Sequence, residues 1–226
     1  MALVAARDEA ERIAATLLAL RTAFPGARVW VADDGSRDGT GQIARREGAM
    51  VARAERVGKG RAVTMAALLA LQELDPGAPA PVVVLCDGDL GHSAVRLGPL
   101  VETVAAGGGE LAVAAFARRR GGGLGIARGF ARWAIRRRCG VVTRAPISGQ
   151  RALTLETLRD VLPLAGGFGM EIGMTIDAVR AGRRLVEVEL DLSHRASGRD
   201  PAGFAHRAAQ LMDFVRVYLG RRSGRS

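Results

Sequence analysis

The sequence predicts an α/β fold in which helices flank a mostly parallel central sheet. The stretch Val82–Leu90, VVVLCDGDL, begins with five apolar residues and ends with two carboxylates separated by a glycine. A short apolar run bounded by turn residues is typical of a strand buried on both faces, as in parallel sheets covered by helices. The chain before it alternates strand-like and helix-like segments, which is the pattern of a doubly wound parallel sheet.

The remaining elements follow in chain order from the spacing of apolar and turn residues. Glycines in Arg118–Gly125 predict a mobile loop. Strands are expected at Ala2–Ala6, Val29–Ala32, Met50–Ala54, Leu111–Ala115 and Leu185–Leu192, the last one half-exposed because it alternates. Helices are expected around Ile13–Leu20 and at Thr40–Glu47, Gly58–Leu74, Ser93–Ala105, Ile126–Arg138, Leu155–Leu162, Met170–Ala181 and Ala202–Leu219.

The 226 residues contain no linker or repeat, so we expect a single domain over 1–226. A net charge of +10, from 33 basic and 23 acidic residues, favours anionic partners such as nucleotides or phosphorylated substrates. Cys86 and Cys139 form no disulfide framework or zinc motif. The beginning of the chain lacks a signal-peptide pattern, and no apolar run approaches the roughly 18 residues of a membrane span. We therefore expect a soluble, cytoplasmic protein.

Three loops rich in carboxylates follow predicted strands: Arg7–Glu9, Asp33–Asp38 and Asp87–Asp89. Ligands of open α/β sheets bind beyond the carboxyl ends of the strands, so these loops indicate one site. Asp87 and Asp89 offer the oxygen ligands that Mg²⁺ or Mn²⁺ prefers beside phosphates. Asp34 can accept hydrogen bonds from a ribose or a base. An alternative for each loop is a turn whose aspartates cap backbone N–H groups.

Lys59 lies between two glycines at a predicted helix start, where it can reach a phosphate or a base oxygen. The alternative is a solvated surface lysine. Gly60 follows Lys59, so the sequence does not match G-x-x-x-x-G-K-[ST], and no G-x-G-x-x-G follows the first strand. These two common nucleotide-binding motifs are therefore excluded.

In this order, VADDGSRDGT, VGKGRA and VVVLCDGDL resemble the nucleotide-sugar half of family 2 glycosyltransferases with a GT-A fold. The opening VAARDEAERI resembles their first-strand motif P-x-x-N-E, with Ala5 in place of the proline and Asp8 in place of the asparagine. The resemblance implies that 1–90 binds a nucleotide-diphosphate sugar and 91–226 binds the acceptor. It implies Mg²⁺ or Mn²⁺ on Asp87 and Asp89. The implied nucleotide-sugar residues are Ala5, Arg7, Glu9, Asp34, Lys59, Asp87 and Gly88.

The second half resembles the glucosyl-3-phosphoglycerate synthases in GGGLGIARGFARW, ISGQRALT and GGFGMEIGMTIDAVRAG. It is also similar to polyprenyl- and dolichyl-phosphate sugar synthases, which have an arginine-led helix, an SG-x-R loop and a late glutamate in the same order. The resemblance implies catalytic roles for Asp89, Arg128 and Glu171. It also implies that His194 is a third metal ligand or contacts the diphosphate, and the alternative is a partly exposed surface histidine. The implied acceptor-binding residues are Arg128, Gly149, Gln150, Arg151 and Glu171.

These observations predict a metal-dependent glycosyltransferase acting on a small phosphorylated acceptor such as 3-phosphoglycerate. One alternative acceptor is a polyprenyl phosphate, which would bring peripheral contact with a membrane. Another alternative is a sugar-phosphate nucleotidyltransferase, but Arg7-Asp8-Glu9 stands where that class carries a glycine-rich loop. A non-catalytic sugar-nucleotide binder stays open, as does a homodimer. We expect no nucleic-acid partner, because aromatic residues are few.

Overall fold

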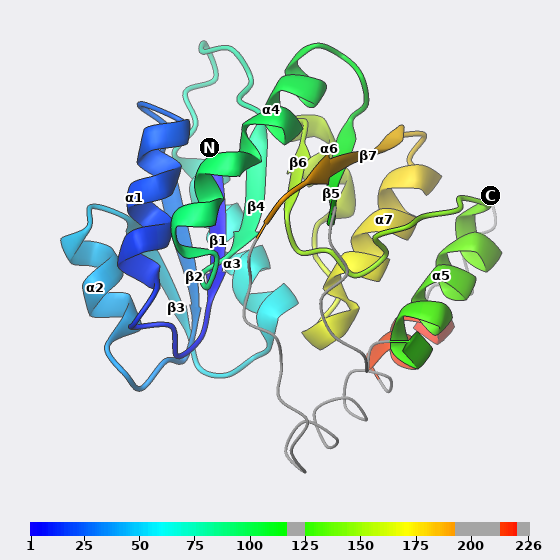
Figure 1. The fold of residues 1–226 in the computed structure, drawn as a ribbon, viewed down its shortest axis with the longest axis horizontal. Helices are drawn as coiled ribbons and strands as arrows, with labels where there is room; N and C mark the ends of the chain where they lie inside the picture. Colours follow the sequence, from blue (N-terminus) through cyan, green and yellow to red (C-terminus); the bar gives the residue numbers. More distant parts are fainter. Residues whose placement is uncertain (117–124, 193–212, 221–226) are drawn as a thin grey trace.

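The computed structural model of the protein describes residues 1–116, 125–192 and 213–220. Within them, a seven-stranded sheet has the order β3-β2-β1-β4-β6-β5-β7 and is flanked by helices (Figure 1). The expected fold class is therefore confirmed. The strands are β1 (Ala2–Ala6), β2 (Val29–Asp34), β3 (Met50–Ala54), β4 (Val83–Asp87), β5 (Leu111–Phe116), β6 (Arg151–Leu153) and β7 (Leu185–Leu190).

Parallel pairing brings the ends of the first, second and fourth strands to the same level. Strand β1 pairs in parallel with β2 and with β4, so Ala6 lies opposite Asp33 and Ala5 lies opposite Asp87. Strand β2 pairs in parallel with β3. Only β6 runs antiparallel, between β4 and β5, while β5 and β7 are parallel. The three carboxylate loops therefore leave the sheet at one edge.

Apolar helix faces cover both sides of the sheet. One core joins it to α1, α2, η1 and α4, and the other joins it to α3, α6 and α7. A helical segment over 213–220, drawn in red in Figure 1, lies beside α5. The bounds are α1 (Ile13–Ala23), α2 (Thr40–Arg46), α3 (Lys59–Gln72), η1 (Gly91–Leu97), α4 (Gly98–Ala105), α5 (Gly125–Cys139), α6 (Leu155–Val161), η2 (Gly167–Gly169) and α7 (Met170–Arg180).

Most expected elements lie within two residues of the observed ones, with three differences. The helix expected at Ser93–Ala105 is divided into 3₁₀ η1 and α4, with Pro99 at the start of α4, where its missing N–H costs nothing. Strand β6 was not predicted, because three residues containing Arg151 carry no strand periodicity. Residues 117–124 and 202–212 lie outside the described residues, so most of the expected loop and the first part of the last helix are untested.

In the described part of the chain, no helix combines the length and the apolar character needed to cross a membrane. Strand β7 is largely half-buried, as its alternating sequence predicts.

Candidate functional site

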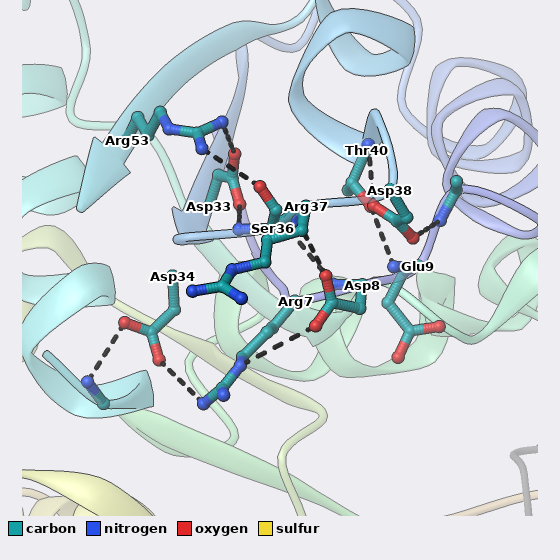
Figure 2. Close-up of polar contacts among 12 residues, drawn as sticks. Arg7, Asp8, Glu9, Asp33, Asp34, Ser36, Arg37, Asp38, Thr40 and Arg53 are labelled. Atoms are coloured by element: carbon teal, nitrogen blue, oxygen red, sulfur yellow. Dashed lines mark hydrogen bonds and ion pairs between the residues drawn. The ribbon is translucent and has the colours of Figure 1, made fainter. Parts of the chain in front are cut away.

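Two of the three predicted loops are bound together by hydrogen bonds at the carboxyl edge (Figure 2). The Asp8 amide donates to Ser36 Oγ at 3.0 Å, and the Arg37 amide donates to Asp8 Oδ1 at 2.8 Å. The Glu9 amide donates to Thr40 Oγ1 at 2.8 Å. These bonds hold Asp8 at φ 55°, a value that non-glycine residues seldom adopt. The loops after β1 and β2 therefore form one preorganised surface.

Asp33 and Asp38 act as capping residues within this surface. Asp33 is fully buried, accepts from the Ser36 amide at 2.9 Å and contacts Arg53 at 3.3 Å. Asp38 accepts from Thr40 Oγ1 at 2.6 Å and from the Ala10 amide at 2.9 Å. Partial desolvation acts to raise the pKa of Asp38, but these hydrogen bonds outweigh it and lower the pKa. The contacts of these two aspartates therefore match the alternative of a turn in which aspartates cap backbone N–H groups.

Asp34 links the second strand to the loop that starts α3. Its side chain is buried, and Oδ1 accepts from the Gly58 amide at 3.0 Å. Its other oxygen lies 3.8 Å from a guanidinium nitrogen of Arg7, whose side chain is half-exposed. Figure 2 shows Asp34 between Arg7 and the start of α3. Three of the expected nucleotide-sugar segments therefore meet here.

Lys59 lies at the junction of the two halves of the chain. Its Nζ is 2.6 Å from Asp87 Oδ1 and 2.7 Å from Glu171 Oε1. The second oxygen of Asp87 accepts from Gln150 Nε2 at 2.9 Å. Burial acts to lower the pKa of Lys59, but the two carboxylates outweigh it and raise the pKa. A cation on α3 thus joins the end of β4 to the first turn of α7.

Two glycines permit close packing around Asp87. A Cβ on Gly149 would lie 2.6 Å from Asp87 Oδ2 and 3.0 Å from Lys59 Nζ, so a side chain would displace this cluster. The Gly88 amide donates to Ala5 O at 2.8 Å, which fixes the turn after β4 against β1. The neighbouring Gly88 carbonyl accepts from Thr16 Oγ1 at 2.8 Å, a contact that sequence reasoning missed.

Arg151 lies deeper than expected. We predicted that it lines an acceptor pocket, but its side chain is fully buried. Its Nε donates to Ser148 O at 2.8 Å and Nη1 donates to Thr175 Oγ1 at 3.0 Å. Desolvation lowers the pKa of Arg151 to about 10, although the charge of Glu171 opposes this shift. Arg151 therefore holds the loop before β6 against α7 and does not line an open surface.

The three residues expected to be catalytic, Asp89, Arg128 and Glu171, lie on different elements, and of these Glu171 contacts Lys59. Asp89 follows β4 and is half-buried, and its carbonyl accepts from Arg12 at 3.3 Å. Glu171 is buried in the first turn of α7, where the helix N-terminus favours a carboxylate. Arg128, half-buried, lies in the first turn of α5. His194 lies outside the described residues.

The carboxylates after β4 fit a divalent cation that also binds substrate oxygens. Asp87 and Asp89 are both partly exposed at the sheet edge and carry hard oxygen donors. Across residues 1–116, 125–192 and 213–220, no group of three His, Cys, Asp or Glu side chains could hold a metal. Asp87 and Asp89 are two donors of this kind, and Mg²⁺ is commonly bound by one or two carboxylates together with substrate phosphates.

Comparisons with known proteins agree with this geometry. Residues 2–152 match the family model described as glycosyl transferase family 2. Glycosyltransferase AglJ from Haloferax volcanii is 29% identical over 178 residues, which are 77% of this chain and 56% of that protein. The chain therefore spans little more than half the length of this curated relative.

Solved structures of glucosyl-3-phosphoglycerate synthase from Mycobacterium tuberculosis share the fold. The complex with Mn²⁺, uridine diphosphate and phosphoglyceric acid has a TM-score of 0.77 and 25% identity, and the match covers 100% of this chain and 78% of that one. The complex with Mg²⁺ and uridine diphosphate has a TM-score of 0.76 and 25% identity, with 100% and 79% coverage. Because the family model spans most of the sequence, from the first strand to the loop at Gly149 and beyond, the chain belongs to glycosyl transferase family 2.

Proposed function

We propose that the protein transfers a sugar from a UDP- or GDP-sugar to a small phosphorylated acceptor, 3-phosphoglycerate in the first instance, with Mg²⁺ or Mn²⁺. The observation that carries this proposal is the Lys59 bridge between Asp87 and Glu171. It brings the end of the donor-side sheet and the acceptor-side helix α7 to one point. The solved relatives support the choice of ligands, since they were crystallised with these metals, uridine diphosphate and phosphoglyceric acid.

The donor occupies the surface between the loops after β1, β2 and β4 in this proposal. Ala5, Arg7 and Glu9 flank the nucleotide on one side, and Asp34 accepts from its ribose or base. Lys59 reaches the base or the diphosphate from the start of α3, and Gly88 lets the diphosphate approach the backbone. The buried position of Asp34 beside Gly58 supports its role, because a fixed acceptor can select a hydroxyl or N–H donor.

The metal site of this proposal consists of Asp87 and Asp89, with His194 as a further candidate ligand. A bound divalent cation neutralises the negative charge that develops on the departing nucleoside diphosphate. In the described contacts Lys59 and Gln150 orient the Asp87 carboxylate, one at each oxygen. Their positions support Asp87 as a fixed ligand rather than a mobile surface side chain.

The acceptor lies between α5, the loop at Gly149 and α7 in this proposal. Arg128 binds its phosphate, since a guanidinium matches phosphate oxygens bidentately. Gln150 and Gly149 line the bottom of the acceptor site, and Arg151 lies beneath these two residues. The Glu171 carboxylate accepts a hydrogen bond from the acceptor hydroxyl and directs that oxygen to the anomeric carbon. In an inverting reaction it also receives the proton, while the bond to the diphosphate oxygen breaks.

A second candidate acceptor is a polyprenyl phosphate at a membrane surface. Trp133 on α5 is 48% exposed, and Arg136 and Arg137 line the same surface hollow. Indole and guanidinium groups together suit the interface of an anionic membrane. The family match leaves the nucleotidyltransferase alternative without support.

The proposal is tested by thermal shift with UDP-, GDP-, ADP- and dTDP-sugars, each with and without Mn²⁺ or Mg²⁺. A ligand that binds only the native state raises the melting temperature. We expect a metal-dependent shift with one nucleotide, which Asp89→Asn abolishes and Asp75→Asn, at the opposite sheet edge, retains. Product formation is then compared between 3-phosphoglycerate and a short polyprenyl phosphate. Folded protein that shifts with no nucleotide would refute the proposal.

A further inference from the structure

A third hydrophobic core joins α5 and α7 through the 213–220 helix. In this core Phe214 has no exposed surface, and Val217 is buried beside it. The 213–220 helix packs against Ala131 and Ile135 of α5 and Ile172 and Ile176 of α7. Arg128 lies on α5 and Glu171 on α7, so the relative placement of these two residues depends on a core built by the 213–220 helix.

Two glycines allow this helix to approach the segment before α7. A Cβ on Gly167 would overlap the Asp213 carboxylate, and a Cβ on Gly169 would overlap Cγ2 of Val217. Gly169 immediately precedes α7, whose second residue is Glu171. The contact is therefore at the residues that set the direction of the first turn of α7.

The opposite side of the same segment packs against the start of α3. A Cβ on Gly60 would overlap the Ala165 carbonyl oxygen, and a Cβ on Gly58 would lie 3.2 Å from the Gly167 amide nitrogen. Residues 165–169 thus lie between the start of α3, which carries Lys59, and the 213–220 helix. The first turn of α7, where Glu171 Oε1 lies 2.7 Å from Lys59 Nζ, directly follows this segment.

Aromatic contacts fix the other face of the 213–220 helix to α5. The Tyr218 ring centroid lies 4.8 Å from that of Trp133, and the guanidinium of Arg138 lies 3.7 Å above the Tyr218 ring. A cation above an aromatic face is attracted by the ring quadrupole. The helix therefore has a defined position between α5 and the segment before α7.

We propose that the 213–220 helix is a positioning element for the acceptor side of the site. Seated on Gly167 and Gly169, it fixes the first turn of α7 and holds Glu171 against Lys59. The kinetic test of this inference rests on the proposed function. Its structural test, by hydrogen exchange, does not require an active enzyme.

The direct test is Gly169→Ala. Gly169 has φ −81° and ψ −5°, values that alanine adopts freely, so the substitution acts through packing against Val217 and not through backbone strain. We expect the KM for 3-phosphoglycerate to rise between about tenfold and a hundredfold, because small displacements of positioning groups have effects of this size. The UDP- and Mn²⁺-dependent thermal shift should stay as in the wild type.

Val217→Ala removes Cγ2, the atom that the new methyl group would overlap, and leaves Val217 Cβ and Asp213 O at 3.3 Å. The double variant Gly169→Ala/Val217→Ala should therefore recover most of the lost acceptor affinity. Gly129→Ala is the matched control, since a Cβ at this α5 position meets nothing within 4 Å. An equal loss of donor and acceptor binding in Gly169→Ala would contradict the inference. So would a double variant as impaired as the single one.

Hydrogen exchange by mass spectrometry gives a readout without turnover. Gly169→Ala should raise exchange of the amides in residues 170–176 and leave those of β1 and β2 unchanged. Phe214→Leu reduces the side-chain volume in the same core without creating a clash. It should also raise exchange of these amides, but by less. If the wild type does not use 3-phosphoglycerate, the proposed acceptor fails, but exchange still decides the inference. Unchanged exchange in both variants would overturn it.

Discussion

Lys59→Met removes the charge that joins the two halves of the protein and keeps most of the side-chain volume. Lys59 makes two contacts to carboxylates, at 2.6 Å to Asp87 and 2.7 Å to Glu171. In the variant both carboxylates lose their shared counterion. The change therefore breaks a partly buried ion network by removing one partner, which costs more than deleting the whole network.

The expected loss follows from how exposed each group is. The side chains of Lys59, Asp87 and Glu171 are 27%, 33% and 8% exposed. Loss of one partner of a fully buried ion pair costs about 3–5 kcal/mol, and exposed pairs contribute about 0–1 kcal/mol. We assign about 2 kcal/mol to the Glu171 contact and about 1 kcal/mol to the more exposed Asp87 contact. The total of about 3 kcal/mol corresponds to a melting temperature lower by about 6–12 °C in a chain of this size.

Urea unfolding of the ligand-free protein measures this loss, and a double-mutant cycle with Glu171→Gln isolates the contact. We expect a coupling free energy of about 2 kcal/mol between Lys59 and Glu171. The control is Arg28→Met, whose pair with Glu73 at 3.6 Å is exposed and should contribute below about 1 kcal/mol. A coupling of zero, or a Lys59→Met loss no larger than that of the control, would refute the reasoning.

Three further substitutions test other contacts. Gly149→Ala should abolish the metal-dependent nucleotide thermal shift, because the added Cβ would lie 2.6 Å from Asp87 Oδ2; an unchanged shift would contradict this. Thr16→Val should lower the free energy of unfolding by about 1–3 kcal/mol, since it leaves buried backbone groups near the turn after β4 without their hydroxyl partner. Hydrogen bonds from Arg184 lower the pKa of Glu110 to about 2, so the stability that Glu110 adds is present above its unfolded pKa of 4.5 and is lost as the pH falls toward 2. The free-energy difference between wild type and Glu110→Gln should vanish over that range, and a difference constant from pH 5 to 2 would disprove it.

The parallel half of the sheet could be predicted because its signals are local. An apolar run followed by carboxylates marks β4, and the same arrangement marks β2. Since parallel strands end at one edge, strand order was not needed to bring Asp34 near Asp87. Antiparallel β6 gave no such signal, because its three residues include a buried arginine and its partners are distant in sequence.

The contacts across the site could not be predicted for a physical reason. Lys59 and Glu171 are 112 residues apart, and each alone has an ordinary local explanation, a surface lysine and a glutamate at a helix N-terminus. The resemblance implied that Arg151 binds the acceptor, but Ser148 O and Thr175 Oγ1 accept hydrogen bonds from its guanidinium in the interior, where arginine is rarely found. Pairing of this kind depends on the folded topology and leaves no periodic pattern.

The Lys59 bridge also determines which experiments can separate stability from function. Lys59 contacts the proposed metal ligand Asp87 and the proposed acceptor residue Glu171, and its loop packs against the segment before α7. A Lys59 variant without activity would therefore combine a weakened donor site, a displaced acceptor residue and a less stable fold. By contrast, Asp89→Asn acts on the donor side of the site, and Gly169→Ala acts on the acceptor side. If the proposed arrangement is right, the first should remove metal-dependent nucleotide binding without moving α7, and the second should impair acceptor use without changing donor binding.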